Sequence, residues 1–380
     1  MSKLLSGNAL KVFQEECAKE IAASKYCIRI CMTGCKAYGA EEVKEALTRE
    51  VGARGLTKTV EIRETGCQGF CARAPVLTID PLGIFYQEVT PADAADIVVR
   101  TIQKGDVLGH LLYEDLKTGL KMPTINQIPF FRLQNRRVLK HCGIIDPKKI
   151  SHYIGMGGYS ALAKALNEMT PDAVIEEVTA SGLRGRGGAG FPTGTKWKFA
   201  SSSPNKPKYV ICNADEGDPG AFMDRAVLEG DPHRVIEGMI IGAYAMGARF
   251  GYIYVREEYP IAVEHLLTAI DQAMEMGILG ENILGSSFSF TLELKMGAGA
   301  FVCGEETALM ASIEGKRGMP RTRPPFPAQA GLDGKPSNIN NVETFANISM
   351  IIQEGAEWYS SVGTEKSRGT KVFSLAGKVN

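Results

Sequence analysis

Apolar and polar residues follow two periods along the first hundred residues of the chain. Short runs of alternating apolar or β-branched residues predict strands, and runs with apolar residues three or four positions apart predict helices. The predicted strands are residues 26–31, 59–63, 76–79 and 84–89, and the predicted helices are residues 41–51 and 91–102. The order β-α-β-β-β-α is that of a small α/β sandwich.

A longer pattern begins after residue 158. Thr170 and Pro171 are typical N-cap and first-turn residues, so residues 170–180 are expected to form a helix. Residues 209–212 form a continuous apolar run, which is typical of a buried parallel strand. We therefore expect an α/β protein with a small domain (1–105), a connecting segment (106–158), a Rossmann-like α/β domain (159–370) and a final strand (371–380).

Charge and composition exclude some classes of partner. Lys plus Arg and Asp plus Glu both total 43, so no net positive charge draws the chain to nucleic acid or to an anionic membrane. The basic run 132–140 has no sustained period and indicates a solvated face. The N-terminus lacks the apolar core of a signal peptide, and the apolar stretch 239–248 is too short to span a bilayer. We expect a cytoplasmic protein without membrane insertion.

Cysteines are concentrated near the N-terminus: six of the nine lie between Cys17 and Cys71. The pairs Cys31-x3-Cys35 and Cys67-x3-Cys71 follow the first and second predicted strands. A [2Fe-2S] cluster needs four thiolates from two converging loops, and these pairs supply them. A structural zinc site remains an alternative, whereas a Cys-x-x-Cys redox dithiol does not fit the spacing.

The stretch 182–197 contains six glycines together with Arg184, Arg186 and Lys196. Such a composition favours a loop whose backbone approaches an anion closely. Gly185, Gly187 and Gly190 match the spacing G-x-G-x-x-G, but a helix and not a strand precedes them, so the standard dinucleotide fingerprint is rejected. Residues 196–199 begin another predicted helix, whose N-terminus would face a bound phosphate.

Four later segments are also rich in polar and glycine residues. Residues 213–220 follow the buried strand and carry Asp215, Glu216 and Asp218, for which a solvated acidic turn is the alternative. In residues 297–307 the glycines are expected to precede a strand, with a helix beginning at Glu305 and Glu306. The others are the proline-rich segment 324–329 and an asparagine-rich turn at 338–344, which caps a helix that runs to residue 353.

Two families share these motifs. Residues 29–40 and 64–75 resemble the thioredoxin-like [2Fe-2S] ferredoxin, in which the first cysteine pair more often encloses four residues than three. Because of that departure Cys27 is an alternative ligand, although a buried strand thiol is the simpler interpretation of it. From residue 150 onwards the chain resembles the flavin- and NADH-binding subunit of respiratory complex I, and even more the matching subunit of soluble NAD-linked hydrogenases and electron-bifurcating complexes.

The second resemblance implies that FMN and NADH bind stacked face to face. Family members often carry Tyr at the position of Phe301 and Glu at that of Asp218. For the phenylalanines of the NADH site, core packing is the alternative. The implied FMN contacts are Gly185, Arg186, Gly187, Lys196, Asn213, Asp215, Glu216, Gly304, Glu305, Ile339, Asn340, Asn341 and Thr344. The implied NADH contacts are Phe191, Phe199 and Phe326 for adenine, with Glu306 and Asp218 near the ribose.

The implied activity is that of an NADH:acceptor oxidoreductase subunit, in which hydride passes to FMN and single electrons then pass to iron–sulfur clusters. Glu305 and Glu306 would tune the redox state of the flavin. The resemblance also implies partner subunits with iron–sulfur clusters, including a small thioredoxin-like ferredoxin. A [4Fe-4S] cluster is expected only in a region beyond residue 380, after a ubiquitin-like domain that residues 371–380 would open. A non-catalytic scaffold, a bifurcating subunit that reduces NAD, and a small-molecule dehydrogenase are the alternatives.

Overall fold

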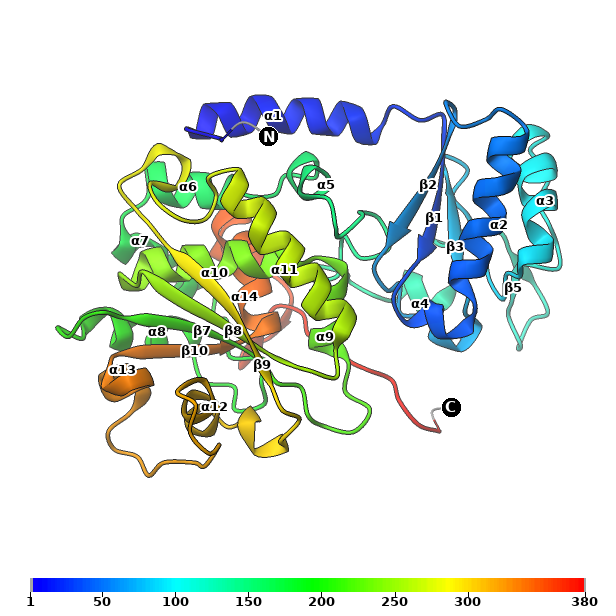
Figure 1. The fold of residues 1–380 in the computed structure, drawn as a ribbon. Coiled ribbons are helices and arrows are strands. Elements are labelled where there is room, and N and C mark those ends of the chain that lie inside the picture. Colours follow the sequence, from blue (N-terminus) through cyan, green and yellow to red (C-terminus); the bar gives the residue numbers. More distant parts are fainter. Residues whose placement is uncertain (1–2, 379–380) are drawn as a thin grey trace.

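The computed structural model describes residues 3–378, which form two packed domains, each with its own sheet (Figure 1). In the small domain the strand order is β2-β1-β3-β4, with β1 parallel to β2 and antiparallel to β3. The strands are β1 (Tyr26–Cys31), β2 (Val60–Thr65), β3 (Leu77–Asp80) and β4 (Ile84–Tyr86). The helices are α2 (Ala40–Ala53) and the closing helix formed by α3 (Ala94–Asp96) and η4 (Ile97–Gln103). The predicted order β-α-β-β-β-α is confirmed.

The large domain contains a parallel sheet in the order β10-β7-β8-β9. Its strands are β7 (Tyr209–Ala214), β8 (Phe250–Arg256), β9 (Thr291–Gly297) and β10 (Ser337–Asn341). Because successive side chains alternate between faces, Val210 joins the main core while Ile211 joins a smaller core on the other side. The sheet is therefore buried on both faces, as expected for an α/β fold.

Helices cover the two faces of this sheet unequally (Figure 1). The main core holds α10 (Pro232–Met246) and α14 (Val342–Glu354), and the smaller core holds α12 (Glu306–Ile313). The other helices of this domain are α6 (Ser160–Glu168), α7 (Pro171–Ala180), α8 (Thr193–Ser202), α9 (Met223–Gly230), α11 (Pro260–Glu275), α13 (Pro327–Ala330) and α15 (Ala356–Ser360). Among residues 3–378, no helix combines the length and apolar character needed to cross a membrane.

Helix α1 (Gly7–Ile21) precedes the small domain in the chain but packs on the large one (Figure 1). Its buried side chains Leu10 and Cys17 belong to the large-domain core. It lies close to α5 (Ile150–Gly155), where a Cβ on Gly155 would come within 2.7 Å of Ile21 Cδ1. The range 1–105 expected for the small domain therefore includes a helix that contributes to the other core.

The segment between the domains also divides between the two cores. Leu108 and Phe131 lie in the small-domain core, whereas Val138 and Ile145 lie in the large one. This segment contains the short antiparallel strands β5 (Tyr113–Glu114) and β6 (Lys121–Met122). It also contains the helices α4 (Pro129–Arg132) and α5. The expected connecting segment 106–158 is thus built into both domains.

Three predicted elements of the C-terminal half differ from the structure. In residues 297–307 the strand β9 precedes the glycines, and Phe301–Gly304 forms a 3-10 turn, so the strand expected after the glycines is wrong. The segment expected to form an asparagine-rich turn is instead the strand β10, because its polar residues pair with β7. Residues 371–378 form no strand: their backbone meets no partner strand in the described part of the chain. The short pair β11 (Gly363–Thr364) and β12 (Ser367–Arg368) precedes them.

Candidate functional site

The carboxyl ends of β7 and β10 bring three of the predicted segments together. The two strands are parallel neighbours, with Asn213 opposite Asn341. The Asn213 amide Nδ2 donates to the Gly304 carbonyl at 2.8 Å, and the Asp215 N–H donates to Asn213 Oδ1 at 3.1 Å. Ligands of open α/β sheets bind at this edge, so the segments meet where a site is expected.

The glycine loop lies at the N-terminus of α14. The Arg186 backbone N–H donates to Thr344 Oγ1 at 2.9 Å, and a Cβ on Gly187 would stand 3.1 Å from Asn341 Cβ. Asn341 caps α14 by accepting the Thr344 N–H, as predicted. A helix N-terminus carries partial positive charge, and a glycine backbone beside it forms a cradle for an anion. We refer to the glycine loop, the carboxyl ends of β7 and β10, and the N-terminus of α14 as the anion cradle.

Lys196 contacts one of the two predicted glutamates. Its ammonium donates to Glu306 Oε2 at 3.0 Å and to the Ile339 carbonyl at 2.7 Å. Arg323 donates to the other oxygen of Glu306 at 2.7 Å. Glu305 has a different role, because its carboxylate caps α12 by accepting the N–H groups of Thr307 and Ala308. Arg323 was not predicted, since nothing in the sequence indicates that its exposed loop folds back on α12.

The three acidic residues after β7 differ in their surroundings. Burial raises the pKa of Asp215 to about 6, despite Arg256 Nη1 at 3.6 Å. Asp215 Oδ2 is buried and lacks a hydrogen-bond partner. Glu216 accepts the N–H groups that begin α9, those of Asp224 and Arg225, both at 3.1 Å. Asp218 is exposed. A simple solvated turn therefore describes Asp218 but neither of the other two.

Three predicted aromatic residues are too exposed for core packing. Phe191, Phe199 and Phe326 expose 48 %, 55 % and 55 % of their surface. The rings of Phe191 and Phe199 lie 6.5 Å apart, and Phe326 caps the helix α13, which packs against α8. Asn340 is instead buried, where its Oδ1 accepts from Trp197 at 2.9 Å and from Asn338. The Asn340 side chain therefore makes its contacts in the interior of the domain and holds the end of β10 in place.

The four predicted cluster thiols lie together at the end of β1 and β2. Hydrogen bonds from Cys35, Cys67 and Thr33 lower the pKa of Cys31 well below its usual value, and the one from Cys67 lowers the pKa of Cys71 to about 7. The same hydrogen bonds, together with burial, raise the pKa of Cys35 and of Cys67. The Sγ atoms of Cys67 and Cys71 are 3.8 Å apart. Four thiols that converge from two loops have the arrangement of [2Fe-2S] ligands.

The alternative ligand Cys27 lies away from the four thiols. It is at the other end of β1, about 13 Å along the strand from Cys31, and burial raises its pKa to about 12. Across residues 3–378, no three Cys, His, Asp or Glu side chains converge closely enough to hold a single metal ion.

Helix α9 connects the two sites. Glu216 caps its first turn, next to the anion cradle. Its last residue, Gly230, packs so closely on Gly66 of the small domain that a Cβ on Gly66 would fall 2.3 Å from Gly230 Cα. Gly66 immediately precedes Cys67. The helix has eight residues and is therefore about 12 Å long.

Comparisons with known proteins agree with this geometry. Residues 178–350 match the family model described as Nuo51 FMN-binding domain, and residues 18–101 match that of the thioredoxin-like [2Fe-2S] ferredoxin. NADP-reducing hydrogenase subunit HndC of Solidesulfovibrio fructosivorans is 62 % identical over 65 % of this chain and 50 % of its own length. NAD-reducing hydrogenase HoxS subunit alpha of Cupriavidus necator is 39 % identical over 93 % of this chain and 58 % of its own.

A solved structure of NAD+-reducing [NiFe]-hydrogenase in the H2-reduced state has a TM-score of 0.54 to this chain. It is 29 % identical and covers 97 % of this chain, which in turn covers 62 % of the hydrogenase chain. The chain spans about half the length of the curated relatives it matches. Those relatives are named as subunits of larger oxidoreductases. The chain thus joins a domain of the thioredoxin-like [2Fe-2S] ferredoxin family to a domain of the Nuo51 FMN-binding family.

Proposed function

We propose that this chain is the flavin-bearing part of an NADH:acceptor oxidoreductase, which takes electrons from NADH and passes them to iron–sulfur clusters. The observation that carries the proposal is the anion cradle itself. Arg186 of the glycine loop and Thr344 of α14 are 158 residues apart in the chain, yet they meet at the sheet edge formed by the carboxyl ends of β7 and β10.

The residues of the cradle fit FMN. Within the loop, the Gly185 N–H donates to the Phe191 carbonyl and the Arg186 N–H to Thr344. The Gly187 backbone and the N-terminus of α14 would therefore hold the phosphate, with the Lys196 ammonium as a charged partner. The unpaired oxygen of Asp215 is an acceptor for an N–H group of the isoalloxazine ring. Bound flavin accepts a hydride as two electrons and releases them one at a time. The chain contributes binding and orientation.

The exposed phenylalanines would bind the NADH adenine by stacking. Glu306 would stand near the ribose. Its carboxylate lies between Lys196 and Arg323, and the ion pairs with these two cations fix its position. Asp218 is exposed and free to reach a ribose hydroxyl. These three groups of contacts distinguish a nucleotide-oxidising subunit from a scaffold that only carries flavin.

Electrons would leave toward the cluster held by Cys31, Cys35, Cys67 and Cys71, which α9 joins to the cradle. Further iron–sulfur subunits, including a small thioredoxin-like ferredoxin, would receive them in a complex located in the cytoplasm. A second candidate is the reverse direction, reduction of the nucleotide, including by electron bifurcation. It is favoured by two relatives named as NADP-reducing and NAD-reducing hydrogenase subunits.

The flavin-binding part of the proposal is tested by titrating the chain with FMN and following flavin fluorescence. Lys196→Ala removes the charged partner of the phosphate, so we expect the Kd to rise about 10- to 100-fold, the range for a hydrogen bond to a charged group. Lys198→Ala, an exposed lysine of the same helix, is the matched control and should leave the Kd unchanged. The visible spectrum of the reconstituted cluster should be the same in all three proteins. Equal FMN affinity in Lys196→Ala and the wild type would contradict the assignment.

A further inference from the structure

Arg186 belongs to the glycine loop, but its side chain is buried. Only 2 % of the side-chain surface is exposed, whereas Arg184, two residues earlier in the same loop, is exposed. A cation that binds a phosphate must present free N–H donors to the ligand. The burial of Arg186 therefore requires a different explanation of its role.

Both Nη atoms of Arg186 donate to other parts of the chain, whereas its buried Nε makes no hydrogen bond. Nη1 donates to the Arg184 carbonyl at 3.0 Å. Nη2 donates to Tyr359 OH, the Arg368 carbonyl and the Thr370 carbonyl at 2.8 to 3.0 Å. Nε stands 3.7 Å from Glu343 Oε1, which also accepts the Val372 N–H at 3.1 Å. The guanidinium thus joins the glycine loop to residues 359–372, here called the C-terminal strap.

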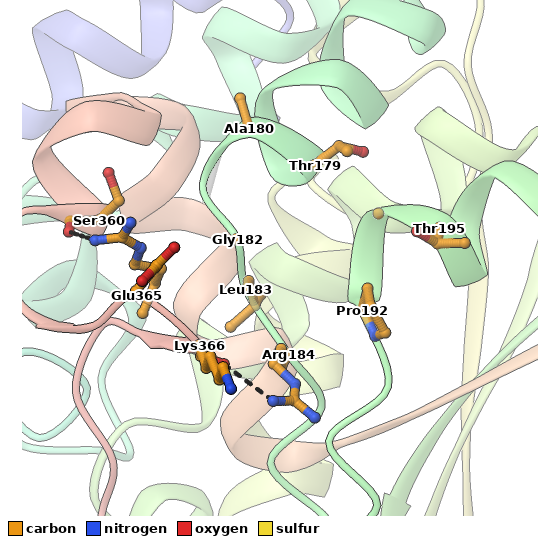
Figure 2. Close-up of a pocket in the computed structure, with 12 residues that line it drawn as sticks. Thr179, Ala180, Gly182, Leu183, Arg184, Pro192, Thr195, Ser360, Glu365 and Lys366 are labelled. Atoms are coloured by element: carbon orange, nitrogen blue, oxygen red, sulfur yellow. Dashed lines mark hydrogen bonds between the residues drawn. The ribbon is translucent and has the colours of Figure 1, made fainter.

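The glycine loop needs such an anchor. Glycines lose more conformational freedom on folding than other residues, so a loop with six of them does not keep one shape by itself. Arg186 has its backbone N–H on Thr344 and its side chain on the strap, so one residue is held from both sides. Arg184 also contacts the strap, because its guanidinium donates to the Lys366 carbonyl at 2.9 Å (Figure 2). Both residues line a cavity of about 310 Å3.

We propose that Arg186 is a positioning residue: it ties the glycine loop to the C-terminal strap and so holds the loop backbone in the shape that receives the flavin phosphate, without touching the phosphate. The strap is then part of the flavin-binding machinery. This inference rests on the proposed function, in which the loop holds FMN. It changes the role of Arg186 from a ligand of the phosphate to the support of its ligands.

Two variants separate positioning from direct contact when FMN affinity is measured. Tyr359→Phe deletes one partner of Arg186, and Tyr359 is fully buried. We expect this variant to raise the FMN Kd about 5- to 10-fold, the usual effect of losing one such hydrogen bond. Arg186→Lys keeps the charge but loses the fork of donors, so it should weaken binding as strongly as Arg186→Gln. Normal affinity in Tyr359→Phe together with near-normal affinity in Arg186→Lys would overturn the proposal.

A double-mutant cycle and hydrogen exchange complete the test. Arg186→Gln combined with Tyr359→Phe should bind FMN no more weakly than Arg186→Gln alone, because both remove the same link, whereas additive losses would contradict the link. Without FMN, the amides of the strap, including Val372, should exchange faster in Arg186→Gln than in Arg249→Gln, a control at an exposed arginine of the same domain outside the strap. Unchanged exchange in Arg186→Gln would refute the anchor. If the wild type binds no FMN, the proposed function fails, and the exchange experiment still decides whether Arg186 holds the strap.

Discussion

Single residues at the two sites are defined by the groups that surround them more than by their type. Arg184 and Arg186 are two positions apart, yet one is exposed and the other is buried under the C-terminal strap. Glu305 and Glu306 are adjacent, yet one caps a helix and the other pairs with two cations. Residue types and motifs predicted that these residues lie close together. They did not predict which of them face a ligand, because that depends on contacts with segments far away in the chain.

Glu229 on α9 allows a test at this scale. Burial is the main cause that raises its pKa to about 7, and Arg225 at 3.9 Å offsets this only in part. A carboxyl with a raised pKa in the folded state stabilises the fold below its unfolded pKa, near 4.5, and this contribution is lost as the pH rises to 7. Glu229→Gln removes this titrating group. From pH 4.5 to pH 8, the free energy of unfolding of the variant should therefore rise by about 1 to 3 kcal/mol relative to that of the wild type.

Urea unfolding of the cofactor-free chain at pH 4.5 and 8, followed by tryptophan fluorescence, measures this gain. Glu281→Gln, at an exposed carboxylate, is the control and should change nothing. If Glu229→Gln and the wild type have the same pH dependence, the buried carboxyl does not titrate in this range.

At the scale of elements, helix α1 shows how chain order and packing diverge. The helix precedes the small domain, but Leu10 is 98 % buried in the large-domain core, and Gly155 of α5 allows the close approach. An amphipathic pattern predicts that a helix covers some core. The pattern does not predict which domain's core the helix covers, because both domains have apolar surface.

Leu10→Ala tests this placement. Removing a large buried side chain leaves a cavity that costs about 2 to 5 kcal/mol. Both tryptophans, Trp197 and Trp358, lie in the large domain, so their fluorescence reports on its unfolding. We expect a lower urea midpoint for Leu10→Ala and an unchanged one for Val12→Ala, whose side chain on the same helix is 59 % exposed. A tryptophan transition unaffected by Leu10→Ala would place α1 outside this core.

Regular apolar elements were predictable from the sequence, and polar ones were not. Strands β1 and β7 and helices α2 and α7 follow the apolar pattern closely. Strand β10 has the sequence Ser-Asn-Ile-Asn-Asn, which indicates a turn until β7 pairs with it. Residues 301–304 are apolar but form a 3-10 turn, since the strand ends before them at Gly297. In both cases tertiary pairing outweighs local propensity.

At the scale of the whole molecule, the two domains are joined so that the thiol loops meet the end of α9. Gly66 and Gly230 touch through their backbones, and Glu64 forms an ion pair with Lys148 at 2.8 Å. The Arg29 side chain also donates to the Gly143 carbonyl across the same boundary. The thiol loops and the cradle therefore lie at opposite ends of one short helix, an arrangement that would suit the proposed electron transfer.

The central claim is that NADH reduces a flavin held in the cradle, and anaerobic stopped-flow absorbance tests it most directly. The FMN- and cluster-loaded chain is mixed with NADH while the flavin band near 450 nm is recorded, a wavelength typical of oxidised flavins. The account predicts a rapid loss of this band in the wild type and in Lys198→Ala, and no such loss in Lys196→Ala at an FMN concentration that saturates the first two proteins but not the third. A chain that binds FMN but keeps its flavin band unchanged after NADH is added would contradict the account.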